Sequence, residues 1–226
     1  MNSLIDIVIK GGPVMVPILA FSVATIACAL ERAQFWYPLL KQEVQIVRSV
    51  LEAARTDLNR AGAIAQRSQH LPIGRFLLAP LKLKHPTPET FRLAMEAAGE
   101  KEFVQMRKGD KLLETTVAVT PLLGLLGTVT GLITTFSNLT IGGGGTAAQA
   151  TAAAGGIGEA LITTAAGLLV AIMALIVYRV LVTLQSRQMD YFSEVGDELE
   201  LIYRQHWYEP SLLSGEPLSQ IPAQIR

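Results

Sequence analysis

The sequence contains little cysteine and little charge, and both shortages exclude classes of protein. Cys28 is the only cysteine among 226 residues, so neither an intramolecular disulfide nor a cysteine-cluster metal site can form. The three histidines, His70, His85 and His206, are dispersed along the chain, and we expect no metal site and no cofactor. The formal net charge is zero, which leaves no excess positive charge to bind nucleic acid.

Sequence motifs of the common enzyme classes are absent as well. The chain contains no G-x-S-x-G, no H-E-x-x-H and no G-x-x-x-x-G-K-[ST] motif, which hydrolases, metalloproteases and P-loop nucleotidases need for their chemistry. A run of four glycines at residues 142–145 is not followed by a lysine. We therefore expect a protein that is not an enzyme.

Charged residues are missing from long parts of a chain that is 50% hydrophobic. Three stretches contain no charge: 11–30, 115–158 and 160–178. Crossing the hydrocarbon of a bilayer takes roughly 20 apolar residues, so the first stretch is long enough for one transmembrane helix. The second is too long for a single helix, and the glycines at 142–145 mark a turn within it. The residues before the turn form the second transmembrane helix, and those after it join the third stretch in one helix that includes Glu159. We therefore predict an all-α integral membrane protein, a helical bundle with three transmembrane helices.

The basic residues predict the topology. Of the 19 lysines and arginines, 14 lie in residues 31–114, four lie after residue 178, and none lies in residues 138–158. Because basic loops stay in the cytoplasm, residues 31–114 and the C-terminus should be cytoplasmic and the N-terminus periplasmic. The predicted segments are an N-terminal segment (1–13), transmembrane helix 1 (14–30), a cytoplasmic helical domain (31–114), transmembrane helix 2 (115–137), a periplasmic glycine-rich loop (138–146), transmembrane helix 3 (147–182) and a cytoplasmic C-terminal helix and tail (183–226).

The first apolar stretch could instead be a cleaved signal peptide, because residues 27–29 form a small-residue pattern like a cleavage site. However, only Lys10 supplies positive charge before the stretch. The charged pair at 31–32 is followed by three aromatic residues at 35–37, as in an interfacial membrane anchor. A retained transmembrane helix is the better interpretation.

The cytoplasmic domain carries helical patterns of its own. Apolar residues keep a four-three spacing at Leu40, Val44, Val47, Leu51, Ala54, Leu58, Ala61 and Ala65, which predicts one amphipathic helix that packs against another helix. Thr87 and Pro88 predict the start of a second helix. This helix should run into transmembrane helix 2, so that long helices extend into the cytoplasm. Residues 70–86 contain three prolines and a glycine and are expected to form a loop with at most short helical turns.

Small and hydroxylated residues form a stripe on transmembrane helix 2. They recur every three or four residues at Thr120, Gly124, Gly127, Thr128, Gly131 and Thr135. One interpretation is ordinary close packing of helices, because small residues let backbones approach each other in lipid. The threonine hydroxyls can likewise bond to the carbonyl one turn back. For Thr128, packing and a role in a polar pathway are both open.

Glu159 is the only charged residue between Glu114 and Arg179. A carboxylate inside a transmembrane helix costs about 2.5–3.5 kcal/mol on insertion scales, and such residues usually face a bundle interior or an aqueous pathway. Alternatively, Glu159 lies in the exposed first turn of its helix, where the helix dipole favours an acid. The alanine-rich residues 146–157 could extend the helix by about three turns and place Glu159 below the surface. Thr163 and Gly167 continue the same helix face.

Two segments resemble a known family. The sequences PLLGLLGTVTG at 121–131 and GIGEALITTAAG at 156–167 are similar to the two core motifs of the ExbB/TolQ/MotA family of proton-channel subunits. Residues 11–15 and the pair at 31–32 resemble the ExbB/TolQ branch. The resemblance implies a homo-pentamer in the bacterial inner membrane. Its second and third helices would line a central pore that holds a dimer of an ExbD/TolR-like single-span subunit. The resemblance also implies a TonB-like or TolA-like envelope protein as a further partner.

The resemblance also assigns residues. Glu159 matches the family's intramembrane glutamate, Thr128 its pore threonine on the second span, and Thr164 its threonine five residues after the glutamate. Helical spacing alone favours Thr163, because four residues rotate the side chain by only about 40° from Glu159 and five by about 140°. Both threonines stay candidates for the proton pathway, whereas Gly124, Gly127, Gly131 and Gly167 are expected to pack helices.

The expected function is that of a proton-channel subunit, ExbB-like, in a motor that couples the proton motive force to TonB-dependent uptake. A TolQ-like role in envelope integrity is the first alternative. A passive membrane scaffold is the second, because such a protein would use the same glycine stripes for packing. Only the scaffold would work without the carboxyl group of Glu159.

Overall fold

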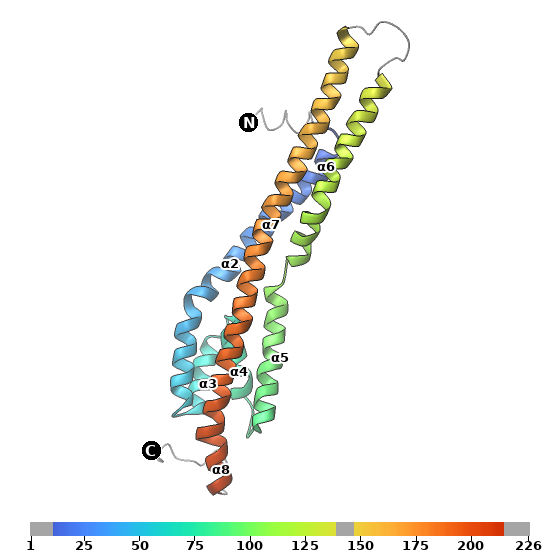
Figure 1. The fold of residues 1–226 in the computed structure, drawn as a ribbon. Helices are drawn as coiled ribbons and strands as arrows, with labels where there is room; N and C mark the ends of the chain where they lie inside the picture. Colours follow the sequence, from blue (N-terminus) through green and yellow to red (C-terminus); the bar gives the residue numbers. More distant parts are fainter. Residues whose placement is uncertain (1–10, 139–146, 215–226) are drawn as a thin grey trace. The chain divides into compact units, whose positions relative to one another are not determined.

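The computed structural model describes residues 11–138 and 147–214, and every regular element in this part of the chain is a helix (Figure 1). The elements are α2 (Met15–Ala54), α3 (Leu58–Arg67), α4 (Pro72–Leu81), α5 (Pro88–Met106), α6 (Asp110–Asn138), α7 (Ala147–Tyr203), the π-helix η1 (Arg204–Tyr208) and α8 (Glu209–Ser214). The prediction of an all-α protein is confirmed. Nearly all of the predicted glycine-rich loop and most of the N-terminal segment and the C-terminal tail lie outside the described residues.

Three helical segments are long and apolar enough to cross a membrane: Met15–Ala54, Pro88–Ser137 and Ala153–Leu213. Each overlaps with one of the three predicted transmembrane helices, and this confirms the number of candidate spans. The chain folds into two compact units. Unit 1 comprises Met1–Arg32 and Gly109–Leu181, and unit 2 comprises Ala33–Lys108 and Val182–Arg226, so α2 and α7 each contribute to both.

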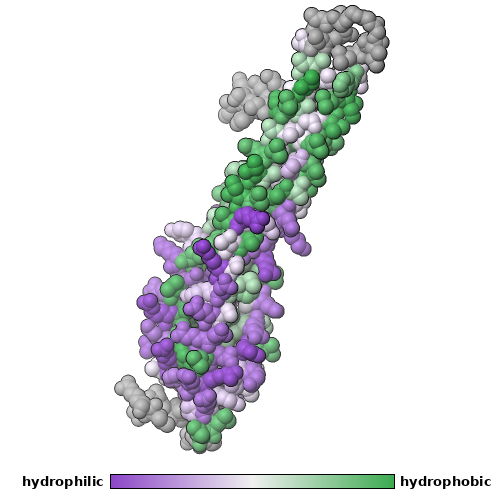
Figure 2. All heavy atoms as spheres, viewed as in Figure 1, coloured by the Kyte–Doolittle hydropathy of each residue, from purple (hydrophilic) through white to green (hydrophobic). Residues whose placement is uncertain are grey.

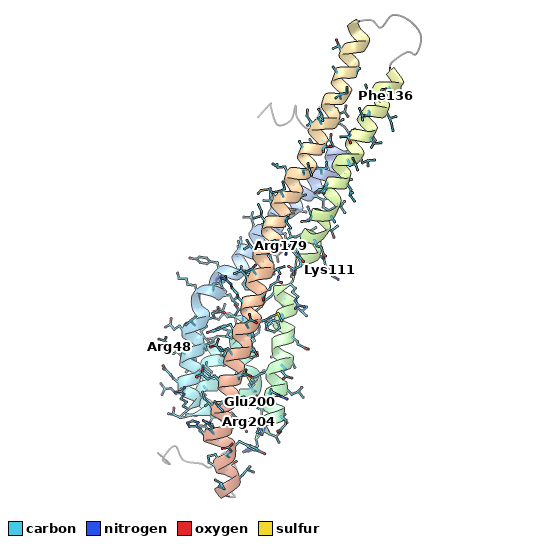
Figure 3. The ribbon with its side chains drawn as sticks, in the orientation of Figure 1. Arg48, Lys111, Phe136, Arg179, Glu200 and Arg204 are labelled. Atoms are coloured by element: carbon cyan, nitrogen blue, oxygen red, sulfur yellow. The ribbon has the colours of Figure 1, made fainter. Side chains whose placement is uncertain are left out.

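Unit 1 consists of α6, the first part of α7 and the beginning of α2 (Figure 1). Its large apolar side chains point outward: Val23, Leu122 and Leu169 are 63–67% exposed. Figure 2 shows a mostly hydrophobic surface over these helices. Lys111 and Arg179 lie toward one end of the unit and Phe136 lies toward the other (Figure 3). Charge at one end and an apolar surface along the helices suit a segment surrounded by lipid.

Unit 2 has the opposite arrangement, with an apolar core and a mostly hydrophilic surface (Figure 2). Phe91, Phe192, Leu199 and Tyr203 are each at most 1% exposed. Helices α3, α4 and α5 surround this core together with the C-terminal part of α7 (Figure 1). An apolar core beneath a hydrophilic surface is typical of a helical domain in water.

The amphipathic helix predicted from Leu40 to Ala65 is wrong in two respects. The helix breaks after Ala54, because the Asp57 side chain accepts hydrogen bonds from the backbone N–H groups of Asn59 and Arg60, at 2.8 and 3.2 Å, and caps a new helix. Furthermore, Leu40 and Val44 are exposed. The buried side of this part of α2 carries Trp36, Leu39 and Glu43 instead.

The expected loop at residues 70–86 contains the helix α4. Pro72 occupies its first turn, where the missing N–H is not needed, and Pro80 is the last residue but one. Seven of the ten residues are buried, and this burial stabilises a helix that proline and glycine content alone argue against.

The helix predicted to run from Pro88 into transmembrane helix 2 is not continuous. A turn at residues 107–109 separates α5 from α6, and Gly109 adopts a φ of 94°, which only glycine adopts readily. In contrast, α7 continues without a break through residue 182, so the predicted boundary between transmembrane helix 3 and the C-terminal helix is not a helix end.

Candidate functional site

Glycines allow α6 and α7 to approach each other closely in unit 1. The four glycines predicted to pack helices all lie buried: Gly124, Gly127, Gly131 and Gly167. A Cβ atom added to Gly127 would lie 2.7 Å from the Cβ of Thr163, and one added to Gly131 would lie 3.0 Å from the Cβ of Ala160. These distances leave no room for a methyl group, so glycine at these positions determines how closely the two backbones approach.

Thr163 lies inside this contact and is only 1% exposed. Its hydroxyl donates to the carbonyl oxygen of Gly11 at 2.8 Å and also lies 2.9 Å from the carbonyl oxygen of Glu159, one turn back on α7. Thr163 therefore connects α7 to the turn that precedes α2. The same side chain lies in contact with Gly127 of α6.

Thr164 lies on a different side of α7 and is half-buried. Its hydroxyl donates to the carbonyl oxygen of Gly124 in α6 at 2.8 Å. The two threonines considered for the proton pathway thus bond to different neighbours, as expected from the rotation of about 100° between adjacent helical residues.

Thr128 is half-buried beside the contact between α6 and α7. Its hydroxyl donates to the carbonyl oxygen of Leu125, one turn back on the same helix, at 2.6 Å. This is the local bond that serine and threonine commonly form in membrane helices. The hydroxyl oxygen still has lone pairs that can accept a further hydrogen bond.

Glu159 lies twelve residues after Ala147, the first residue of α7, or about 18 Å along the helix at 1.5 Å per residue. It therefore does not occupy the first turn, which was the alternative placement. The side chain is half-buried. It lies against Gly12, where an added Cβ atom would collide with the Glu159 carboxylate.

The contact with Gly12 is a part of the site that sequence reasoning missed. The sequence identifies residues 11–15 only as a family motif, although Gly12 lies against Glu159 and Gly11 bonds to Thr163 in the fold. The two adjacent glycines followed by Pro13 indicate a turn before a helix. Nothing in that signal indicates that the turn packs on a residue 147 positions further along the chain.

The arrangement brings one ionisable group together with hydroxyl groups between apolar helices. A carboxyl group can bind and release a proton, and threonine hydroxyls can both donate and accept hydrogen bonds. The hydroxyl of Thr163 lies 2.9 Å from the main-chain carbonyl oxygen of Glu159. Within residues 11–138 and 147–214, no group of three or more His, Cys, Asp or Glu side chains could hold a metal ion.

The sequence matches the MotA/TolQ/ExbB proton channel family over residues 68–194. The biopolymer transport protein ExbB-like 1 of Synechocystis is 67% identical over 207 residues, which cover 92% of this chain and 82% of the relative. A second Synechocystis protein, ExbB-like 3, is 41% identical over 202 residues, or 88% of this chain and 95% of the relative. The Tol-Pal system protein TolQ of Haemophilus influenzae is 29% identical over 216 residues, covering 85% of this chain and 88% of TolQ.

Proposed function

Because the chain belongs to the MotA/TolQ/ExbB proton channel family, we propose that it is a proton-channel subunit of a motor in the bacterial inner membrane. The motor couples the proton motive force to work in the cell envelope. The N-terminus is periplasmic and the C-terminus is cytoplasmic, in line with the distribution of basic residues.

The observation that carries this proposal is the place of Glu159. It is the only charged residue between Glu114 and Arg179 and lies about three turns inside α7, where the hydroxyl of Thr163 is 2.9 Å from its main-chain carbonyl oxygen. A helix this apolar loses stability in lipid by carrying a carboxylate, and intramembrane acids therefore usually serve an ion or proton pathway. We propose that Glu159 carries protons and that Thr128, Thr163 and Thr164 supply hydrogen bonds along the path.

The proposed assembly is a homo-pentamer that surrounds the helices of an ExbD/TolR-like single-span subunit. The apolar outer surface of unit 1 supports contacts with lipid and with other transmembrane helices. A transmembrane potential supplies about 2.3 kcal/mol per charge per 100 mV. This energy per proton is enough to bias the packing of pentamer and partner helices between two arrangements.

The downstream partner is proposed to be a TonB-like protein, with TonB-dependent uptake as the energised process. The relatives at 67% and 41% identity carry ExbB-like names, whereas TolQ is 29% identical. An envelope-integrity motor with a TolA-like partner is the alternative that the TolQ relative supports.

The experiment is proton uptake into liposomes under an imposed potential. The liposomes contain the full chain co-purified with an ExbD/TolR-like single-span subunit, and three forms are compared: native, Glu159→Gln and Glu114→Gln. The glutamine variant keeps the shape of Glu159 and removes its ability to ionise. Glu114 is an exposed carboxylate of α6 in unit 1 and serves as the matched control.

We expect partner-dependent flux that falls at least tenfold in Glu159→Gln and is unchanged in Glu114→Gln, since loss of a required proton-transfer group typically costs 10²–10⁴-fold. If the Glu159→Gln variant conducts protons as fast as the native chain, the proton path runs through an acidic residue of the partner and the threonines and does not include Glu159. No flux in an intact complex would favour a passive scaffold.

A further inference from the structure

The turn before α2 is attached to α7 at the level of Glu159. Gly11 is buried, and its carbonyl oxygen accepts the hydrogen bond from Thr163. The carbonyl oxygen of Gly12 then accepts from the N–H of Met15 at 3.1 Å, which begins α2. The turn is thus held at both ends, by α7 on one side and by its own helix on the other.

Two features favour glycine at position 12. Its φ of 68° lies in the left-handed region, which residues with a Cβ atom rarely adopt. In addition, the Glu159 carboxylate occupies the place of the missing side chain, because an added Cβ atom would overlap with its Oε1 atom. The carboxylate therefore lies directly against the backbone of the turn.

We infer that Gly12 is a positioning residue for the Glu159 carboxyl group, and that the turn of Gly11 and Gly12 covers this carboxyl on the side of α2. Proton transfer needs donor and acceptor atoms within about 2.6–3.2 Å of each other. A misplacement of about 1 Å can slow a reaction by about 100-fold. This inference rests on the proposed function, because the position of the carboxyl matters for flux only if Glu159 carries protons.

The test is the substitution Gly12→Ala in the full chain with its single-span subunit, measured in two ways. The first readout is proton flux into liposomes, which we expect to fall at least tenfold. The second is the rate at which dicyclohexylcarbodiimide modifies Glu159, followed by mass spectrometry. We expect this rate to rise at least threefold, because the added methyl group pushes the carboxyl away from the turn that covers it.

Gly109→Ala is the matched control for backbone strain. Gly109 also has a positive φ, 94°, and a Cβ added there would lie 2.6 Å from the Sγ atom of Cys28. Gly131 of α6 packs beside Ala160, the residue that follows Glu159. Gly109 lies 22 residues before Gly131, which is about 33 Å along α6. The control thus carries the same kind of strain in unit 1 at a distance from Glu159.

Shortening the acid tests whether the two positions are coupled. Glu159→Asp withdraws the carboxyl group by one methylene, so that it no longer reaches the place of a side chain at position 12. If the two positions are coupled, we expect Gly12→Ala to reduce the proton flux of the Glu159→Asp variant by less than twofold. If they act independently, Gly12→Ala should reduce that flux by the same factor as in the native chain.

Two results would overturn the inference. One is a modification rate in Gly12→Ala no higher than in Gly109→Ala; the other is a full tenfold loss of flux in the Glu159→Asp background. If the native complex conducts no protons, the proposed function fails, and the modification rate alone decides the inference. If Gly12→Ala does not fold, Thr163→Val, which removes the hydrogen bond to Gly11, must raise the modification rate in its place.

Discussion

The two units share the long helices α2 and α7, yet different kinds of side chain hold each unit together. In unit 1, α6 and α7 meet through Gly124, Gly127 and Gly131, and threonine hydroxyls bond between the elements. In unit 2, aromatic rings fill the core: Phe91 stacks on Tyr203 with centroids 4.3 Å apart. Large apolar side chains are thus on the outside of one unit and on the inside of the other.

This difference reflects what surrounds each unit. In water, burying aromatic and aliphatic surface drives helices together, at about 25 cal/mol per Å². In lipid that driving force is absent, and helices associate through close packing of small residues and through hydrogen bonds. The same contrast predicts which substitutions lower the stability of each unit. In unit 2 it is the removal of a buried charge partner, and in unit 1 it is the addition of side-chain volume.

The largest expected effect is in unit 2, at the ion pair of Arg75 and Glu102. Glu102 is 4% exposed, and both of its oxygens accept from Arg75, at 2.7 and 2.5 Å. These hydrogen bonds raise the pKa of the Arg75 guanidinium. Arg75→Met leaves the Glu102 carboxylate buried without its partner, and we expect a loss of about 3 kcal/mol in the stability of unit 2.

Hydrogen exchange of the α4 amides in the detergent-solubilised protein measures this loss, because it reports local opening free energies. The control is Arg55→Met, which breaks the exposed pair of Arg55 and Glu198 and should cost less than about 1 kcal/mol. Equal effects of the two substitutions would show that burial of the carboxylate does not decide the stability of unit 2.

The next effect is in unit 1, at Gly127. Gly127→Ala places a methyl group against Thr163, and overpacking of this kind typically costs about 1–3 kcal/mol. Gly155→Ala is the matched control, because nothing lies within 4 Å of its added Cβ atom and alanine favours helix by about 1 kcal/mol. Thermal unfolding in micelles should show a lower midpoint for Gly127→Ala and an unchanged or higher one for Gly155→Ala. A similar response of the two variants would mean that close approach at Gly127 is not what holds α6 and α7.

Much of unit 1 could be predicted from the sequence, because charge is a local signal. The absence of charged residues between Glu114 and Arg179, apart from Glu159, predicted two helices, and the alanine-rich residues 146–157 predicted that Glu159 lies about three turns inside the second. Sequence periodicity could not reveal which residues touch each other across long separations. The contact of Gly12 with Glu159 depends on how the chain packs.

Unit 2 was predicted less well, since its helices are defined by burial rather than by local pattern. Apolar spacing continues through Asp57, but the Asp57 side chain caps a new helix there. Residues 72–81 contain two prolines and a glycine and form a helix, because most of their side chains lie in the core. In such segments tertiary contacts override local propensity.

The smallest expected effect concerns Glu43, a buried carboxyl group of α2 in unit 2. Glu43 is 7% exposed and accepts a hydrogen bond from Gln188 of α7 at 2.5 Å. Burial raises its pKa above the usual 4.5, although the bond to Gln188 opposes this. Tyr191 of α7 is close enough for the charge of Glu43 to help raise the pKa of the tyrosine as well.

The folded protein therefore binds the Glu43 proton more tightly than the unfolded chain does. Stability from this group is fully present below about pH 4.5 and is lost as the pH rises through the higher folded pKa. We expect the opening free energy of the α7 amides near Gln188, measured by hydrogen exchange, to fall over this window. Glu43→Gln should abolish that fall, whereas Glu52→Gln, at an exposed position of the same helix, should leave it in place. An identical pH dependence in the Glu43→Gln variant and the native protein would show that another group in unit 2 binds the proton.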